Sequence, residues 1–164
     1  MRSIIYKGGV EVHFLKEAHD THNAYFEFLC VIKAGARNPM PHYHEGFDET
    51  VFGEKGIITW TVNGKTTDVG PGEKLFIPRG VTHMFENRTN QTIEFRCQTT
   101  PAKVFGPEYF EDIATVLNVD SVPDFAELQN IMKSHGLIPV PGFKRTLIFA
   151  ILGLIRKMKG GNKR

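Results

Sequence analysis

The chain has 164 residues, 41% of them hydrophobic, with 13 Phe, 16 Gly and a formal net charge of +2. This length allows one domain with a sizeable core and leaves no room for two. The composition disfavours a helical bundle or a disordered chain and favours a globular protein rich in strands and tight turns. No apolar run reaches the ~20 residues that span a bilayer, so we expect a soluble protein.

The net charge conceals an acidic body followed by a basic tail. No Asp or Glu follows Glu127, and the last 37 residues carry eight cations, which leaves residues 1–127 with 12 cations against 18 acids. An acidic body without a helix-turn-helix pattern argues against nucleic-acid binding. Only Cys30 and Cys97 are present, and the first residues lack the features of a secretory signal, so we expect a reducing, cytoplasmic setting.

The first hundred residues show the pattern of short strands separated by turns. Segments 24–33 and 92–99 place apolar side chains at every second position, which predicts strands with one buried face. Asn63 and Gly64 lie between two extended runs, a strong signal for a hairpin. Many short strands at regular spacing predict a sandwich or a barrel.

After the strand region, longer segments are compatible with helices. We place these helices at residues 107–118, 123–135 and 143–159. Pro123 suits a first helical turn, and Gly136 suits a helix end. The chain therefore is expected to end in a helical region.

The candidate metal ligands are a group of histidines and a glutamate. In a strand, residues two apart point to the same side, so His42 and His44 can present both imidazoles to one point inside a barrel. Glu49 has the wrong parity to join them on an unbroken strand, and a turn or bulge at Gly46 would correct it. His83 follows another tight turn. Three imidazoles and a carboxylate are a ligand set for one divalent ion, with positions left open for water or substrate.

The same positions resemble the two motifs of the cupin superfamily. The first motif, His-x-His followed by Glu and then Gly, is matched by His42, His44, Glu49 and Gly56. The second motif is matched at every spacing by Gly72, Pro78, Gly80, His83 and Asn87. The resemblance covers roughly residues 20–100 and implies a mainly β fold, the double-stranded β-helix (jelly-roll) barrel, with the metal inside one mouth. We expect residues 1–105 to form this barrel and residues 106–164 to form a C-terminal helical extension packed on the barrel or on a dimer partner.

The residues around the predicted metal site are assigned from strand parity. Cys30 and Cys97 fall on apolar strand faces, where packing as small hydrophobes outweighs ligation or redox work. Glu49 is either a permanent ligand or one that detaches to act as a base, and the sequence does not choose between them. We expect the pocket to be lined by Phe85, Trp60, Phe28, Cys30, Phe95 and Cys97.

The sequence is compatible with two functions. The resemblance implies a metal-dependent enzyme acting on a small organic molecule, with a dioxygenase of the quercetin dioxygenase-like type as the leading reaction. The alternative is a barrel that binds or senses a small ligand or a metal without turnover. The ion would be Fe, Mn, Ni or Zn.

The partners follow from the sheet edges and from the basic tail. We expect a homodimer, because a strand-rich body needs its sheet edges covered. Residues 147–155 form an apolar run between cations, which suits a helix either on anionic lipid or on the acidic body. We favour packing on the body or on a partner subunit, because the charge asymmetry already offers an internal partner.

Overall fold

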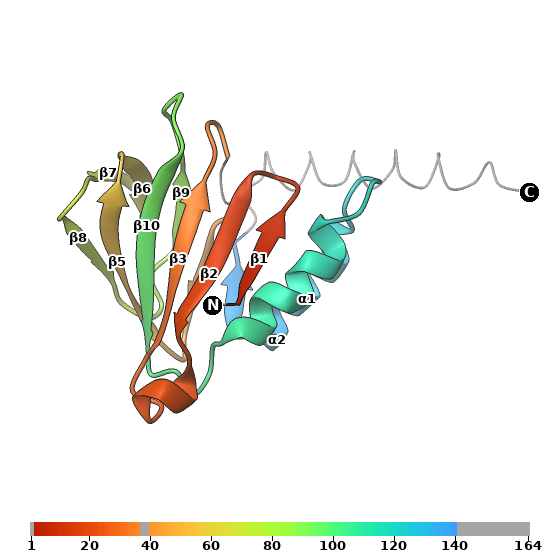
Figure 1. Cartoon of the computed structure of the whole chain (residues 1–164). Coiled ribbons are helices and arrows are strands. Elements are labelled where there is room, and N and C mark those ends of the chain that lie inside the picture. Colours follow the sequence, from red (N-terminus) through yellow and green to blue (C-terminus); the bar gives the residue numbers. More distant parts are fainter. Residues whose placement is uncertain (1, 37–39, 141–164) are drawn as a thin grey trace, which may run out of the picture.

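The computed structural model describes residues 2–36 and 40–140 (Figure 1). The helix expected at residues 143–159 lies outside these ranges. The strands of the described part are β1 Ser3–Tyr6, β2 Val10–Lys16, β3 Phe26–Ile32, β4 His42–His44, β5 Asp48–Lys55, β6 Ile58–Val62, β7 Lys65–Val69, β8 Lys74–Ile77, β9 His83–Glu86, β10 Ile93–Thr100 and β11 Leu137–Pro139. The helices are the 3-10 turn Ala18–Thr21, α1 Pro107–Leu117 and α2 Phe125–Ser134.

The strands form two antiparallel sheets. One has the order β1-β2-β3-β10-β5-β8, and the other has the order β11-β4-β9-β6-β7. The chain changes sheet at each step from β3 to β6 and again at each step from β7 to β10, so most consecutive strands in this part face each other across the core. The mainly β jelly-roll barrel with C-terminal helices is therefore confirmed.

Strand alternation places the core between the two sheets. Every second residue of β3 is buried, from Phe26 to Ile32, and the same holds for β10 from Ile93 to Thr99. The two strands pair directly, with Phe95 opposite Cys30. The periodicity read from the sequence therefore predicted both strands and their inward faces.

The hairpin between β6 and β7 has the predicted turn. Asn63 and Gly64 both have positive φ angles, 47° and 77°, the backbone that a two-residue hairpin of type I′ requires. Val62 and Lys65 are the first pair of the ladder. This register turns Trp60 of β6 inward, where it is 2% exposed and pairs with Phe85 of β9.

The two helices lie against the β1 end of the barrel (Figure 1). The Tyr6 hydroxyl of β1 donates a hydrogen bond to the Phe110 carbonyl of α1, with 2.7 Å between the oxygens. The second helix differs from the prediction at its start, because the Asp124 side chain caps it and Pro123 precedes the helix. None of the helices in the described ranges is both long and apolar enough to cross a membrane.

Strand β11 was not predicted from the sequence. Its three residues pair antiparallel with β4, so that Leu137 lies opposite His44 and Pro139 lies opposite His42. A strand this short shows no periodicity, and Gly136, with φ of 76°, follows the end of α2, as the sequence predicted. The extension therefore contributes a strand that supports the backbone of two predicted metal ligands.

Candidate metal centre

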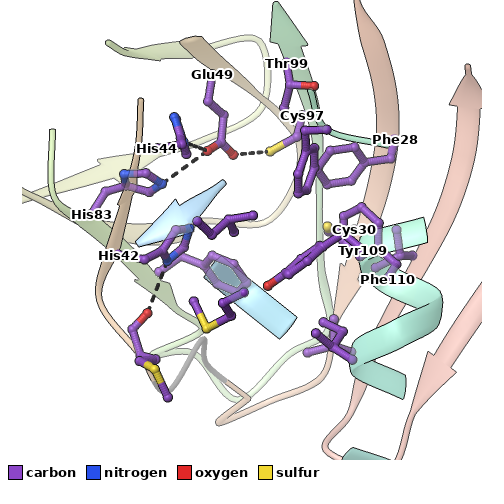
Figure 2. Close-up of a pocket in the computed structure, with 18 of the residues that line it drawn as sticks. Phe28, Cys30, His42, His44, Glu49, His83, Cys97, Thr99, Tyr109 and Phe110 are labelled. Atoms are coloured by element: carbon purple, nitrogen blue, oxygen red, sulfur yellow. Dashed lines mark hydrogen bonds and ion pairs between the residues drawn. The ribbon is translucent and has the colours of Figure 1, made fainter. Parts of the chain in front are cut away.

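Three predicted ligands meet at one point between the sheets. His44 of β4 and His83 of β9 come from one sheet, and Glu49 of β5 comes from the other. The Glu49 Oε2 atom lies 3.2 Å from Nε2 of His44 and 3.2 Å from Nε2 of His83 (Figure 2). One ligand atom from each residue lies within 4.8 Å of the other two, and all three residues are buried.

The turn after β4 brings Glu49 to the two imidazoles. Residues 45–47 bend away from the strand, and the chain then enters the opposite sheet at Asp48. The predicted turn at Gly46 is therefore confirmed, and it acts by changing sheets. A Cβ atom at Gly46 would lie 2.8 Å from the Val104 side chain, so this position leaves little room for a larger residue.

Backbone carbonyls fix the tautomers of both imidazoles. His44 Nδ1 lies 2.8 Å from the Phe47 carbonyl oxygen, and His83 Nδ1 lies 2.8 Å from the Val81 carbonyl oxygen. Because a carbonyl only accepts, each Nδ1 must carry the proton and donate it. In the neutral rings, both Nε2 lone pairs therefore face the Glu49 carboxylate. This is the arrangement that orients histidine ligands in metal sites.

The donor set fits a divalent cation. His83 Nε2 is buried and makes no hydrogen bond within the described part of the chain, although Glu49 Oε2 is near. Burial acts to raise the pKa of Glu49, but the close contact of its carboxylate with the His44 and His83 rings holds the pKa well below its ordinary range. Two lone pairs and an ionised carboxylate repel one another unless a cation lies among them. Two nitrogens and one oxygen suit a borderline ion such as iron, manganese, nickel or zinc.

His42, the fourth predicted ligand, lies beside this cluster. Its ring centre is 4.6 Å from that of His83 and 6.2 Å from that of His44. Its Nδ1 lies 3.2 Å from the Met40 carbonyl oxygen. Burial, followed by the neighbouring imidazole of His83, lowers the pKa of His42 to about 3, so the ring is neutral. The group of mutually close ligand atoms does not include His42, and its ligation stays a prediction.

Cys97 contacts the far side of the Glu49 carboxylate, which sequence reasoning missed. Its Sγ donates to Glu49 Oε1 over 2.9 Å, so that Oε2 is left facing the imidazoles. Burial, together with the charge of Glu49, raises the pKa of the Cys97 thiol well above its ordinary value, so it remains a donor. Both cysteines are buried and free, as the packing assignment expects. The contact follows from the register between β10 and β5, which places Thr99 opposite Glu49 and Cys97 two residues away. The sequence alone does not give this register.

A cavity of about 330 Å³ adjoins the cluster. All four predicted ligands lie on its wall, and Trp60 faces into it. The six residues predicted to line the pocket also lie there, namely Phe85, Trp60, Phe28, Cys30, Phe95 and Cys97. The helices add side chains that the sequence did not assign to the pocket, including Tyr109 and Phe110 of α1 and Met132 of α2.

Asp48, which precedes Glu49, points away from the cavity wall to an arginine. Its carboxylate accepts hydrogen bonds from the Arg79 backbone, at 2.9 Å, and from the guanidinium, at 3.1 and 2.7 Å. The hydrogen bonds from Arg79 lower the pKa of Asp48 to about 2. Asp48 therefore holds the turn before β9 in place.

The family comparison matches the part of the chain that carries these ligands. The model of the Cupin domain matches residues 28–98. Residues 28–98 of the chain form a cupin domain. All three clustered ligands and His42 lie inside the matched range, whereas α1, α2 and β11 of this cupin lie outside it. No match was found among curated proteins.

Several solved structures resemble the barrel over somewhat more than half of the chain. A predicted oxalate decarboxylase from Thermotoga maritima is 26% identical, with a TM-score of 0.53 over 56% of this chain and 80% of that protein. The polyketide cyclase RemF from Streptomyces resistomycificus is 26% identical, with a TM-score of 0.52 over 60% and 68%. A sugar phosphate isomerase from Silicibacter pomeroyi is 24% identical, with a TM-score of 0.49. The match with the isomerase covers 56% of this chain and 59% of that protein.

Proposed function

We propose that this cupin is a metal-dependent enzyme that acts on a small organic molecule held in the cavity. The observation that carries the proposal is the cluster of His44, His83 and Glu49 on the wall of a 330 Å³ cavity. Three protein ligands leave positions for a substrate or water, which is the ligand arrangement of catalytic rather than structural sites. The names of two similar structures, a cyclase and a predicted decarboxylase, support an enzyme.

The clustered histidines and Glu49 would hold the ion, and the ion would activate the substrate. A bound ion would polarise a substrate oxygen as a Lewis acid and, if redox active, pass electrons to dioxygen. His44 and His83 would hold it through Nε2, because their Nδ1 atoms are occupied by carbonyls. Glu49 would act as a ligand, because its lowered pKa makes it a weak base while it faces the imidazoles. Accepting a substrate proton would require the carboxylate to leave this position.

Dioxygenase chemistry is the reaction that we put forward first. The cavity wall around the cluster is mainly aromatic and aliphatic, a lining that would disfavour water beside a reactive species. Both cysteines are buried thiols, which suits a reducing compartment such as the cytoplasm. The alternative is a non-catalytic cupin that would bind or sense a small ligand or a metal through the same cavity and ligands.

Turnover separates the two functions. The full chain would be loaded with iron, nickel or manganese, and oxygen uptake and product formation would be measured across enols, flavonols and thiols. We expect turnover that Glu49→Gln abolishes. Glu45→Gln is the matched control, because Glu45 is an exposed glutamate in the same turn. Binding without turnover across the panel would reject the enzyme in favour of the sensor.

A further inference from the structure

The far wall of the cavity comes from outside the cupin domain. Of the twenty-six described residues that line the cavity, ten follow residue 98, where the family match ends, and α1 and α2 supply most of these ten. The side chains Ile113, Leu117, Leu128 and Met132 make this wall aliphatic. The extension therefore shapes the part of the cavity that a molecule bound at the metal ligands would meet.

Away from the metal ligands, the cavity wall carries no positive charge to match an anion. None of the lining residues in the described part of the chain is Lys or Arg, and Glu49 is the one carboxylate. An anionic group placed away from the metal ligands would lose its hydration without gaining a partner, at a large free-energy cost. The wall away from the metal ligands therefore disfavours a second anionic group, such as the second carboxylate of a dicarboxylate.

Three polar groups on the wall point to a ligand with oxygen atoms. Trp60 Nε1 and Thr99 Oγ1 are buried without a hydrogen-bond partner in the described residues, although buried polar groups are normally satisfied. Both residues are at least 98% buried and line the cavity. The Tyr109 hydroxyl points from α1 into the cavity (Figure 2). By contrast, the Tyr6 hydroxyl is engaged by the Phe110 carbonyl.

Tyr109 is placed to donate a hydrogen bond. It lies on the buried face of α1 with Phe110 and Ile113, and its ring contacts Phe105 at 5.0 Å and His135 at 5.7 Å between centres. These contacts fix the direction of the ring. Burial, followed by the charge of Glu49, raises the pKa of Tyr109, so the hydroxyl remains protonated.

We infer that the cavity takes an uncharged, mainly apolar organic molecule with at least two oxygen atoms, one facing the metal ligands and one accepting a hydrogen bond from Tyr109. This deepens the proposed function, because the molecule would be the substrate. Tyr109 would be a positioning and specificity residue supplied by the extension. The same wall would reject molecules of similar size that carry anionic groups.

Two naphthalenes with the same skeleton test this inference on the full chain. 1,5-Dihydroxynaphthalene is neutral, and 1,5-naphthalenedisulfonate carries a charge at each of the same positions. Trp60 is the one tryptophan in the sequence and lies on the wall, so its indole N–H resonance reports occupation of the cavity. We expect the diol to shift this resonance in metal-free protein, and we expect no shift from the disulfonate at the same concentration.

Two tyrosine variants separate positioning from general packing. Tyr109→Phe should weaken binding of the diol by about 3- to 10-fold, the effect of one net hydrogen bond, and leave the folding transition in place. Tyr25→Phe should change nothing, because Tyr25 does not line the cavity. Equal shifts from diol and disulfonate, no shift from either, or equal affinities of the two variants would overturn the inference. Because metal-free protein is used, failure of turnover would leave this result untouched.

Discussion

Removing the Cys97 thiol should destabilise the metal-free protein more than removing the thiol of Cys30. Cys97 Sγ donates to Glu49 Oε1 over 2.9 Å, and both residues are less than 10% exposed. A hydrogen bond to a charged group contributes about 1.5 to 3 kcal/mol, and a thiol is a weak donor, so we expect about 1 to 2 kcal/mol here. Cys97→Ala would leave Oε1 of a buried carboxylate without this donor.

Cys30→Ala is the matched control for the lost sulfur. Cys30 is also a buried free thiol, on the neighbouring strand β3, so both variants lose similar packing. Urea unfolding followed by Trp60 fluorescence gives both free energies of unfolding. We expect Cys97→Ala to lose about 1 to 2 kcal/mol more than Cys30→Ala, and Cys97→Ser to regain part of the difference. Equal losses in the two alanine variants would refute the role of the thiol.

Three further predictions concern the surface and the assembly. Asp48→Asn should cause a small loss of stability at pH 7 that disappears in acid. The pKa of Asp48 is lowered from 3.8 to about 2, so the contribution of its carboxylate to stability is lost as the pH falls through that value. A loss that is independent of pH in urea titrations would contradict this. Light scattering should give a homodimer at micromolar concentration, since edge strand β8 exposes Phe76, which is 59% exposed, and a monomer would refute the assembly. Deleting residues 143–164 should lower the melting temperature or break the dimer, and the intact chain should not bind anionic vesicles at physiological salt. Salt-sensitive vesicle binding by the intact chain, with stability unchanged by the deletion, would favour a membrane role.

The sequence predicts those parts of the fold that depend on a local pattern of residues, such as alternating burial in a strand or a turn dipeptide. Strands β3 and β10 alternate over seven and eight residues, so their buried faces follow from the pattern alone. The hairpin at Asn63 and Gly64 follows from the backbone angles that these residues tolerate. The two helices were placed within two residues at each end. Strand β11 was missed, because pairing with a distant strand, and no local pattern, makes it a strand.

The site could be predicted only in part for the same reason. Strand parity brings His42 and His44 to one face, and the turn at Gly46 was correctly expected to bring Glu49 near them. The contact between Cys97 and Glu49 depends on the register between β10 and β5, which no local pattern encodes. The place of Tyr109 on the cavity wall depends on how α1 packs on β1, a contact between residues more than a hundred positions apart.

Strand parity predicts the position of His42 but not whether it is a metal ligand. Parity predicts that it shares a face with His44, and both are buried between the sheets. Parity does not fix the direction of the ring, which the Met40 carbonyl holds 4.6 Å from His83, measured between ring centres. Whether His42 ligates therefore depends on the orientation of its ring, and a variant must decide it.

Elemental analysis of protein purified without chelators measures the metal centre most directly. We expect about one divalent transition-metal ion per chain, held by the clustered side chains. His44→Ala and His83→Ala should each lose most of this metal, and His42→Ala should do so if His42 is the fourth ligand. His19→Ala is the control, because that side chain is 77% exposed and lies outside the cavity wall. Unchanged metal content in both His44→Ala and His83→Ala would contradict the metal centre.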